Sequence, residues 1–279
     1  MNGLKQQSQN LSDSLKKESR YFLNLMRNNA KHLFLLSPPL SGSTAIAKLL
    51  QTSPHVAVFP KNGEGQFLPE AQSKLFVDQR WNPDFEVDWS GVKKIFFKYW
   101  SPLKPIRFEK TPPQVVRALD LEQVFNQSYF LVTIRNPYAQ IEGLLRRQWP
   151  FGEYGPQTSS APPASPKMAA EFWVRVAKHQ KYNLEKLQKT CFFSYEELTE
   201  TPNQVVEKVL QFLPEISTLD TQAKLHAHNI TGESITGLKN LNQEKIDRLT
   251  LEQIQDINEV LSQNIEILSF FKYSMIDVD

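Results

Sequence analysis

The segment between His32 and Leu50 constrains the fold of this chain more than any other feature. Residues 32–37 form a short continuous apolar run, which is typical of a strand buried on both faces of a parallel sheet. Two prolines and a Gly-Ser turn follow, and apolar residues then recur at helical spacing as far as Leu50. This order predicts a strand, a tight loop and a helix, as in an α/β domain.

A second unit of the same kind begins at residues 129–134, which form another apolar strand. The strand runs into Arg135-Asn136-Pro137, and a helix follows in which Pro137 suits the first turn because its missing N–H costs nothing there. Between the two units, the pattern predicts a helix that begins at residues 107–113 and runs to about residue 125. After the second unit, it predicts a helix over 168–187, a strand over 191–194, helices up to residue 212 and a helical tail over 241–271. Strands that alternate with helices predict a three-layer α/β/α domain with a central parallel sheet.

The domain is expected to cover residues 31–279. Residues 1–30 are polar and carry only a partial apolar stripe, so they are interpreted as a polar N-terminal lead-in. Residues 150–167 are rich in proline, glycine and serine, which predicts a flexible loop or lid.

Composition excludes several classes of protein. The chain has 279 residues with 32 Lys and Arg against 30 Asp and Glu, so its charge of +2 gives no field suited to nucleic acid and any phosphate site must be local. The single cysteine, Cys191, excludes an intramolecular disulfide, and no cluster of metal ligands is visible, so no metal is expected. Without a signal sequence or an apolar span, the protein is expected to be soluble and cytoplasmic.

The loop after the first strand has the properties of an anion site. A helix N-terminus offers unpaired N–H groups and the positive end of its dipole, Gly42 allows a close approach, and Ser41, Ser43 and Thr44 add hydroxyl groups. A simple N-cap with a turning glycine explains these residues equally well. The nucleoside triphosphatase pattern is not met, because a first glycine and a lysine after Gly42 are both lacking, and this disfavours a kinase or GTPase.

Five motifs in order resemble the sulfotransferase superfamily, whose members use 3′-phosphoadenosine 5′-phosphosulfate (PAPS). The motifs span about residues 32–273, and they are Pro39-Leu40-Ser41-Gly42-Ser43-Thr44, Glu109-Lys110-Thr111-Pro112, Arg135-Asn136-Pro137, Tyr195-Glu196-Glu197-Leu198 and residues 232–239 with the helix that follows. Their style is closest to the tyrosylprotein, Golgi-like branch, in what looks like a soluble, bacterial-type member.

The resemblance implies a P-loop-like sulfotransferase fold, PAPS as co-substrate without a metal, and transfer to a hydroxyl or amine of a small-molecule, carbohydrate or peptide acceptor. It implies that residues 41–44 hold the 5′-phosphosulfate and that Arg135 holds the 3′-phosphate. Lys110 would assist the leaving phosphate and Glu64 would act as the acceptor's base. Lys239, with Ser234, would close over the nucleotide. A solvated lysine and a flexible polar turn remain open for Lys110 and Glu64, and histidine is a weaker alternative base.

Two positions depart from the family pattern. Leu40 stands where many relatives carry a basic residue at the reacting group, and Gly143 stands where the family has a serine for the 3′-phosphate. Arg146, Arg147 or a loop residue would then have to replace that serine. A nucleotide-binding protein without turnover is therefore an alternative to a sulfotransferase, and a small-molecule P-loop kinase is a more distant one.

Overall fold

The computed structural model describes residues 2–27, 29–223 and 238–278. Its centre is a five-stranded sheet in the order β2-β3-β1-β4-β7, in which every neighbouring pair is parallel. The strands are β1 (Lys31–Leu36), β2 (Val56–Val58), β3 (Ile106–Glu109), β4 (Ser128–Ile134) and β7 (Thr190–Ser194). This confirms the predicted fold class.

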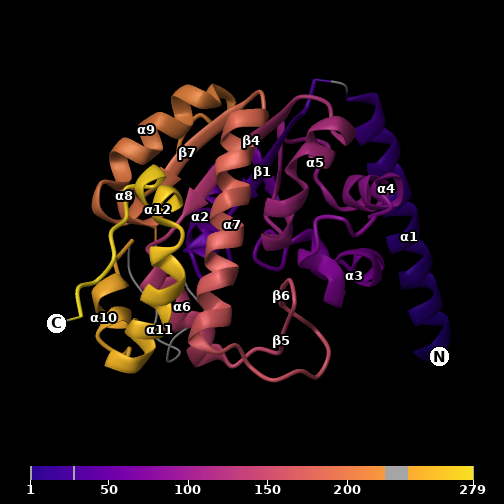
Figure 1. The fold of residues 1–279 in the computed structure, drawn as a ribbon. Coiled ribbons are helices and arrows are strands. Elements are labelled where there is room, and N and C mark those ends of the chain that lie inside the picture. The colour runs from indigo at the N-terminus through magenta and orange to yellow at the C-terminus, as the bar shows by residue number, and fades with distance from the viewer. Residues whose placement is uncertain (1, 28, 224–237, 279) are drawn as a thin grey trace.

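Helices cover both faces of the sheet because successive side chains of a strand point to opposite sides. Leu33 and Leu35 of β1 belong to a core shared with α2 (Ser43–Gln51) and α9 (Pro202–Phe212). Phe34 and Leu36 belong to a second core shared with α4 (Trp89–Tyr99) and α7 (Pro166–Lys186). Figure 1 shows α7 crossing in front of the sheet, so three layers result.

The remaining helices lie around this framework (Figure 1). The long α1 (Asn2–Met26) lies beside α4, where the Asn24 amide donates to the carbonyl of Phe97 at 2.7 Å. The others are α3 (Pro69–Leu75), α5 (Ala118–Val124), α6 (Pro137–Arg147), α8 (Tyr195–Glu200), α10 (Asn242–Ile246), α11 (Leu251–Ser262) and α12 (Ile265–Phe270). Within the described ranges, no helix combines the length and the apolar character needed to span a membrane.

The structure corrects the sequence prediction in three segments. The predicted helix from residue 107 is strand β3 instead, and helical turns begin only at Pro112. Arg107 and Glu109 hid the strand, because both charged side chains are buried in it. The helical tail is divided into α10, α11 and α12, and residues 150–167 contain a small hairpin of β5 (Phe151–Gly152) and β6 (Gly155–Pro156).

Candidate active site

Four chain segments meet at the carboxyl edge of the sheet, where open α/β sheets bind ligands. The loop after β1 leads into α2, and the loop after β2 carries Glu64. Lys110 follows β3 directly, and Arg135 follows β4 directly. The order of the sheet makes β3, β1 and β4 adjacent, so residues that are far apart in sequence share one site.

The loop after β1 exposes the start of α2. Leu40 has φ +64° and Gly42 has φ +81°, and the Gly42 position caps the helix without any side-chain hydrogen bond. A Cβ atom at Gly42 would lie 2.8 Å from a ring carbon of Tyr195, so glycine is required both by the backbone and by the space. The N–H groups of the first turn of α2 lack intrahelical partners and can therefore bind an anion.

Lys110 connects this helix start to Glu64. Its Nζ atom lies 2.7 Å from Glu64 Oε1 and 3.2 Å from Ser43 Oγ. Gln66 Nε2 donates to the other oxygen of Glu64 at 2.5 Å. Lys110 and Glu64 are both buried, so the ion pair is a built part of the site and neither a solvated lysine nor a flexible polar turn.

Glu109, which the sequence reading did not single out, supports the loop that carries Glu64. Its Oε1 atom accepts the Gly65 N–H at 3.0 Å and the Thr111 hydroxyl, and its Oε2 atom has no hydrogen-bond partner among the described residues. Complete burial raises the pKa of the Glu109 carboxyl to about 7. The only available sequence signal was its position between the strand residue Phe108 and Lys110.

The raised pKa of Glu109 predicts a pH-dependent stability. Because its usual value is 4.5, the folded protein holds this proton more tightly, and the stabilisation present below pH 4.5 is lost as the pH rises through 7. The Glu109→Gln variant stays neutral, so its free energy of unfolding should rise relative to wild type by up to about 3 kcal/mol between about pH 5 and pH 8. Urea unfolding across this range measures the difference. The exposed Glu207, replaced by Gln, is the control and should give a flat difference; a flat difference for Glu109→Gln would contradict the assignment.

Arg135 forms the second part of the site. Its Nη1 atom donates to the carbonyl of Leu40 at 2.7 Å and its Nε atom donates to Asn242 at 2.8 Å. The guanidinium carbon lies 3.8 Å from the centroid of the Tyr195 ring, the ring that also lies against Gly42. Its Nη2 atom is enclosed and has no partner among the described residues, which leaves one donor for an anion.

Lys245 lies over Gly143, where the family pattern has a serine. A Cβ atom on Gly143 would lie 2.8 Å from Lys245 Nζ and 3.0 Å from Leu40 Cδ1, so the two departures from the pattern are matched in space. The lysine also pairs with Glu142 at 3.2 Å. Burial lowers the pKa of Lys245 to about 8, and the charge of Arg135 adds to this effect. Sequence reasoning missed Lys245, which lies about a hundred residues after Gly143.

The remaining predicted nucleotide residues differ in what they present. The Ser41 hydroxyl is buried and donates to Gln140 at 3.1 Å, whereas Thr44 lines the cavity described next. Lys239 is exposed, and its backbone carbonyl accepts the Tyr195 hydroxyl at 3.0 Å. Lys239 and Arg135 therefore both contact Tyr195. Ser234 and most of the 232–239 motif lie outside the described residues.

A cavity of about 360 Å³ opens beside the Lys110 ion pair. Its walls come from the β1–α2 loop, the segment 61–81, the start of the turn after β3 and the loop 149–157. The predicted lid, residues 150–167, therefore contributes to the wall through Pro156 and Gln157, and Trp149 lies directly before it. His32, His55 and His179, the three described histidines, do not line the cavity. The described part of the chain contains no group of three or more His, Cys, Asp or Glu that could hold a metal ion.

Solved sulfotransferases share this fold. The sulfotransferase domain from the curacin biosynthetic pathway has a TM-score of 0.51 at 18% identity, with coverage of 88% of this chain and 99% of that chain. The sulfotransferase domain of the Synechococcus PCC 7002 olefin synthase gives 0.53 at 17% identity, covering 89% and 97%. Sulfotransferase STF9 from Mycobacterium avium gives 0.55 at 13% identity, covering 88% and 78%. No family model and no curated protein matches the sequence.

The chain therefore has the sulfotransferase fold. This confirms, for the fold, the resemblance that the five motifs indicated.

Proposed function

We propose that this protein is a PAPS-dependent sulfotransferase that acts on a hydroxyl or amine of its acceptor. The observation that carries the proposal is the position of Lys110, whose Nζ atom contacts both Glu64 and Ser43 at the start of α2. A cation at this point is within reach of an anion on the helix N-terminus and of a carboxylate suited to act as a base. Both roles are needed at one reacting centre.

A nucleotide with two phosphate groups fits the charges of the site. One anion site is the start of α2. The other lies between Arg135 and Lys245. Among the described residues, Arg135 Nη2 has no partner, and the one carboxylate that pairs with Lys245, Glu142, also pairs with Arg146 and Arg248. Two buried cations that share so little negative charge favour an anionic ligand. We assign the start of α2 to the 5′-phosphosulfate and the Arg135–Lys245 pair to the 3′-phosphate.

The proposed reaction forms a bond between the acceptor oxygen or nitrogen and the sulfur of PAPS and breaks the bond between that sulfur and the oxygen of the 5′-phosphate. Glu64 takes the proton of the acceptor. Lys110 turns from Glu64 toward the departing phosphate oxygen, which keeps the electron pair of the broken bond as 3′-phosphoadenosine 5′-phosphate (PAP) leaves. The movement of one ammonium group then stabilises the leaving group and frees the base. In this scheme Lys110 replaces the cation that is missing at Leu40.

Thermal shift with PAP, AMP and ATP tests the nucleotide class. At roughly 100 times its Kd, PAP should raise the Tm by about 5 °C or more, and AMP, which lacks the 3′-phosphate, should act more weakly. In Lys245→Met the ratio of the affinity for PAP to the affinity for AMP should fall about 10- to 100-fold, because a charged hydrogen bond to the 3′-phosphate is lost. Lys48→Met, in the helix that follows the loop, is the control, since the Lys48 side chain donates to Gln51 at 3.5 Å and takes no part in the proposed site.

Each alternative function has its own outcome. Stabilisation by ATP without any effect of PAP would overturn the proposal in favour of a kinase. Binding of PAP without transfer from labelled PAPS to any hydroxyl or amine acceptor in a panel would indicate a binding protein. Transfer of label to an acceptor would support the enzyme.

A further inference from the structure

The cavity beside Lys110 contains positive charge that the proposed chemistry does not use. Its charged lining residues are Lys61, Glu64, Arg80 and Lys110. Glu64 pairs with Lys110, whereas the ion pairs of the described residues include neither Lys61 nor Arg80. The cavity therefore has two cations that form no ion pair with a described carboxylate, although the charges of Asp78 and Glu64 act on Arg80 from a longer distance.

Arg80 is held in place, but only part of its hydrogen-bonding capacity is used among the described residues. Its guanidinium carbon lies 4.4 Å from the centroid of the Phe76 ring. Its Nη2 atom is 3.5 Å from the carbonyl oxygen of Gln157, which is a long contact, and its Nη1 atom is enclosed without a partner among the described residues. An enclosed donor without an acceptor is unfavourable, so an anionic group near this guanidinium would be bound strongly.

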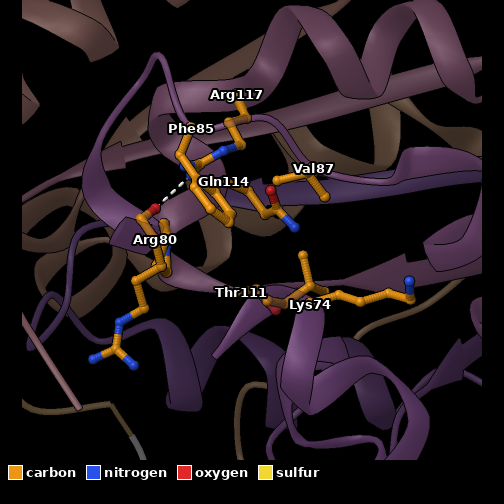
Figure 2. Close-up of a pocket in the computed structure, with 9 residues that line it drawn as sticks. Lys74, Arg80, Phe85, Val87, Thr111, Gln114 and Arg117 are labelled. Atoms are coloured by element: carbon orange, nitrogen blue, oxygen red, sulfur yellow. Dashed lines mark hydrogen bonds between the residues drawn. The ribbon is translucent and has the colours of Figure 1, made fainter. Parts of the chain in front are cut away.

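Arg117 fixes the backbone from which Arg80 projects. Its guanidinium donates to the carbonyl oxygens of Arg80, Gln79 and Asn82, the last two at 3.3 and 2.6 Å. Figure 2 shows the smaller pocket around this contact, and the guanidinium of Arg80 points away from the other labelled side chains. Arg80 also lines the larger cavity. Its backbone therefore contacts Arg117 beside the smaller pocket, whereas its charged side chain belongs to the larger cavity.

Asp78, the nearest acidic residue in sequence, is already used by the loop that closes the cavity. One carboxylate oxygen accepts the Thr158 N–H at 2.7 Å, the Thr158 hydroxyl at 2.6 Å and the Ser159 N–H at 2.9 Å. These bonds hold the pKa of Asp78 well below its usual range. They also attach residues 158–159, next to Gln157, to the segment that carries Arg80.

We infer that the acceptor carries an anionic group, a carboxylate, sulfate or phosphate, which Arg80 binds inside this cavity. Four aromatic residues, Phe67, Phe76, Trp81 and Trp149, also line the cavity, so the body of the acceptor is flat or apolar. The inference rests on the proposed function, because it assigns this cavity to the acceptor.

Matched acceptors test the inference. The phenol 4-hydroxyphenylpropionate is compared with its amide, and the aromatic amine 4-aminophenylacetate is compared with its amide. Binding to the full chain loaded with PAP is measured by calorimetry, and transfer is measured with labelled PAPS. The anionic member of a pair should be preferred about 10- to 100-fold, and Arg80→Met should reduce this preference toward one, mainly through KM.

Arg175→Met is the control variant. Arg175 donates to the carbonyl of Glu153 at 2.8 Å in the same closing loop but does not line the cavity, so the preference should be kept. Equal binding of charged and neutral members, failure of every anionic probe to bind at millimolar concentration, or an unchanged preference in Arg80→Met would each overturn the inference. If PAP binds in these experiments, such a result leaves the proposed function intact; loss of PAP binding itself would contradict the proposed function instead.

Discussion

Replacing Glu64 with Gln is expected to lower kcat by about 10²- to 10⁴-fold, the usual contribution of a positioned general base. Glutamine keeps the size of the side chain and one acceptor oxygen, which can replace either the oxygen that accepts from Lys110 at 2.7 Å or the one that accepts from Gln66 at 2.5 Å. It cannot take a proton from the acceptor. Steady-state transfer from labelled PAPS measures the loss.

The binding of PAP separates this effect from damage to the fold. Thermal shift with PAP should be nearly the same in Glu64→Gln and wild type, since the nucleotide cations Arg135 and Lys245 are on other elements. An exposed control, Glu207→Gln, should keep full transfer activity. Full transfer activity in Glu64→Gln would show that another group is the base.

Replacing Lys110 with Met is expected to lower kcat by about 10²- to 10³-fold, as when a single donor to a developing negative charge is removed. The chain has no basic residue at Leu40 to take over the charge. The variant also leaves Glu64 buried without its cation, and breaking a buried pair in this way costs about 3–5 kcal/mol of stability. Urea unfolding should be measured together with the transfer rate, so that activity lost through unfolding is distinguished from activity lost at the reaction step.

The double variant Glu64→Gln, Lys110→Met distinguishes chemistry from stability. It removes both charges, so its free energy of unfolding should recover toward wild type, because no buried charge is left uncompensated. Its transfer rate should fall little below that of the weaker single variant, since residues that act as a unit are not additive. Activity that returns together with stability would contradict the proposed role of the pair.

The strands and loops that the sequence predicted correctly share one property. β1 and β4 carry apolar runs because nearly all of their residues are buried, and β7 is buried at Cys191 and Phe193. Gly42 and Pro137 mark the helix starts that follow β1 and β4. Such patterns are local, so a reader of the sequence can recognise them. Strand β3 lacked that signal, because Arg107 and Glu109 are charged and yet buried.

The pairing of Glu64 with Lys110 could be predicted only in part. Glu64 and Lys110 were predicted as separate residues by resemblance, but their 2.7 Å contact depends on the adjacency of β2, β3 and β1 in the sheet. The position of Glu109 beneath them follows from the same packing. Secondary-structure propensities and sequence motifs depend on residues that are neighbours along the chain. The pairing of parallel strands, in contrast, joins segments that are separated by whole helices.

The sequence alone was sufficient for the α/β/α class and for the strand, tight loop and helix of residues 32–50, because burial and turn chemistry depend on residues that are close together in the chain. It could not say what compensates for Leu40 and Gly143. That depended on α10, which brings Lys245 to 2.8 Å from the position of a Cβ atom on Gly143 across about a hundred residues of chain. The charge of a site is the sum over all segments that converge on it, and only the folded chain decides which segments those are.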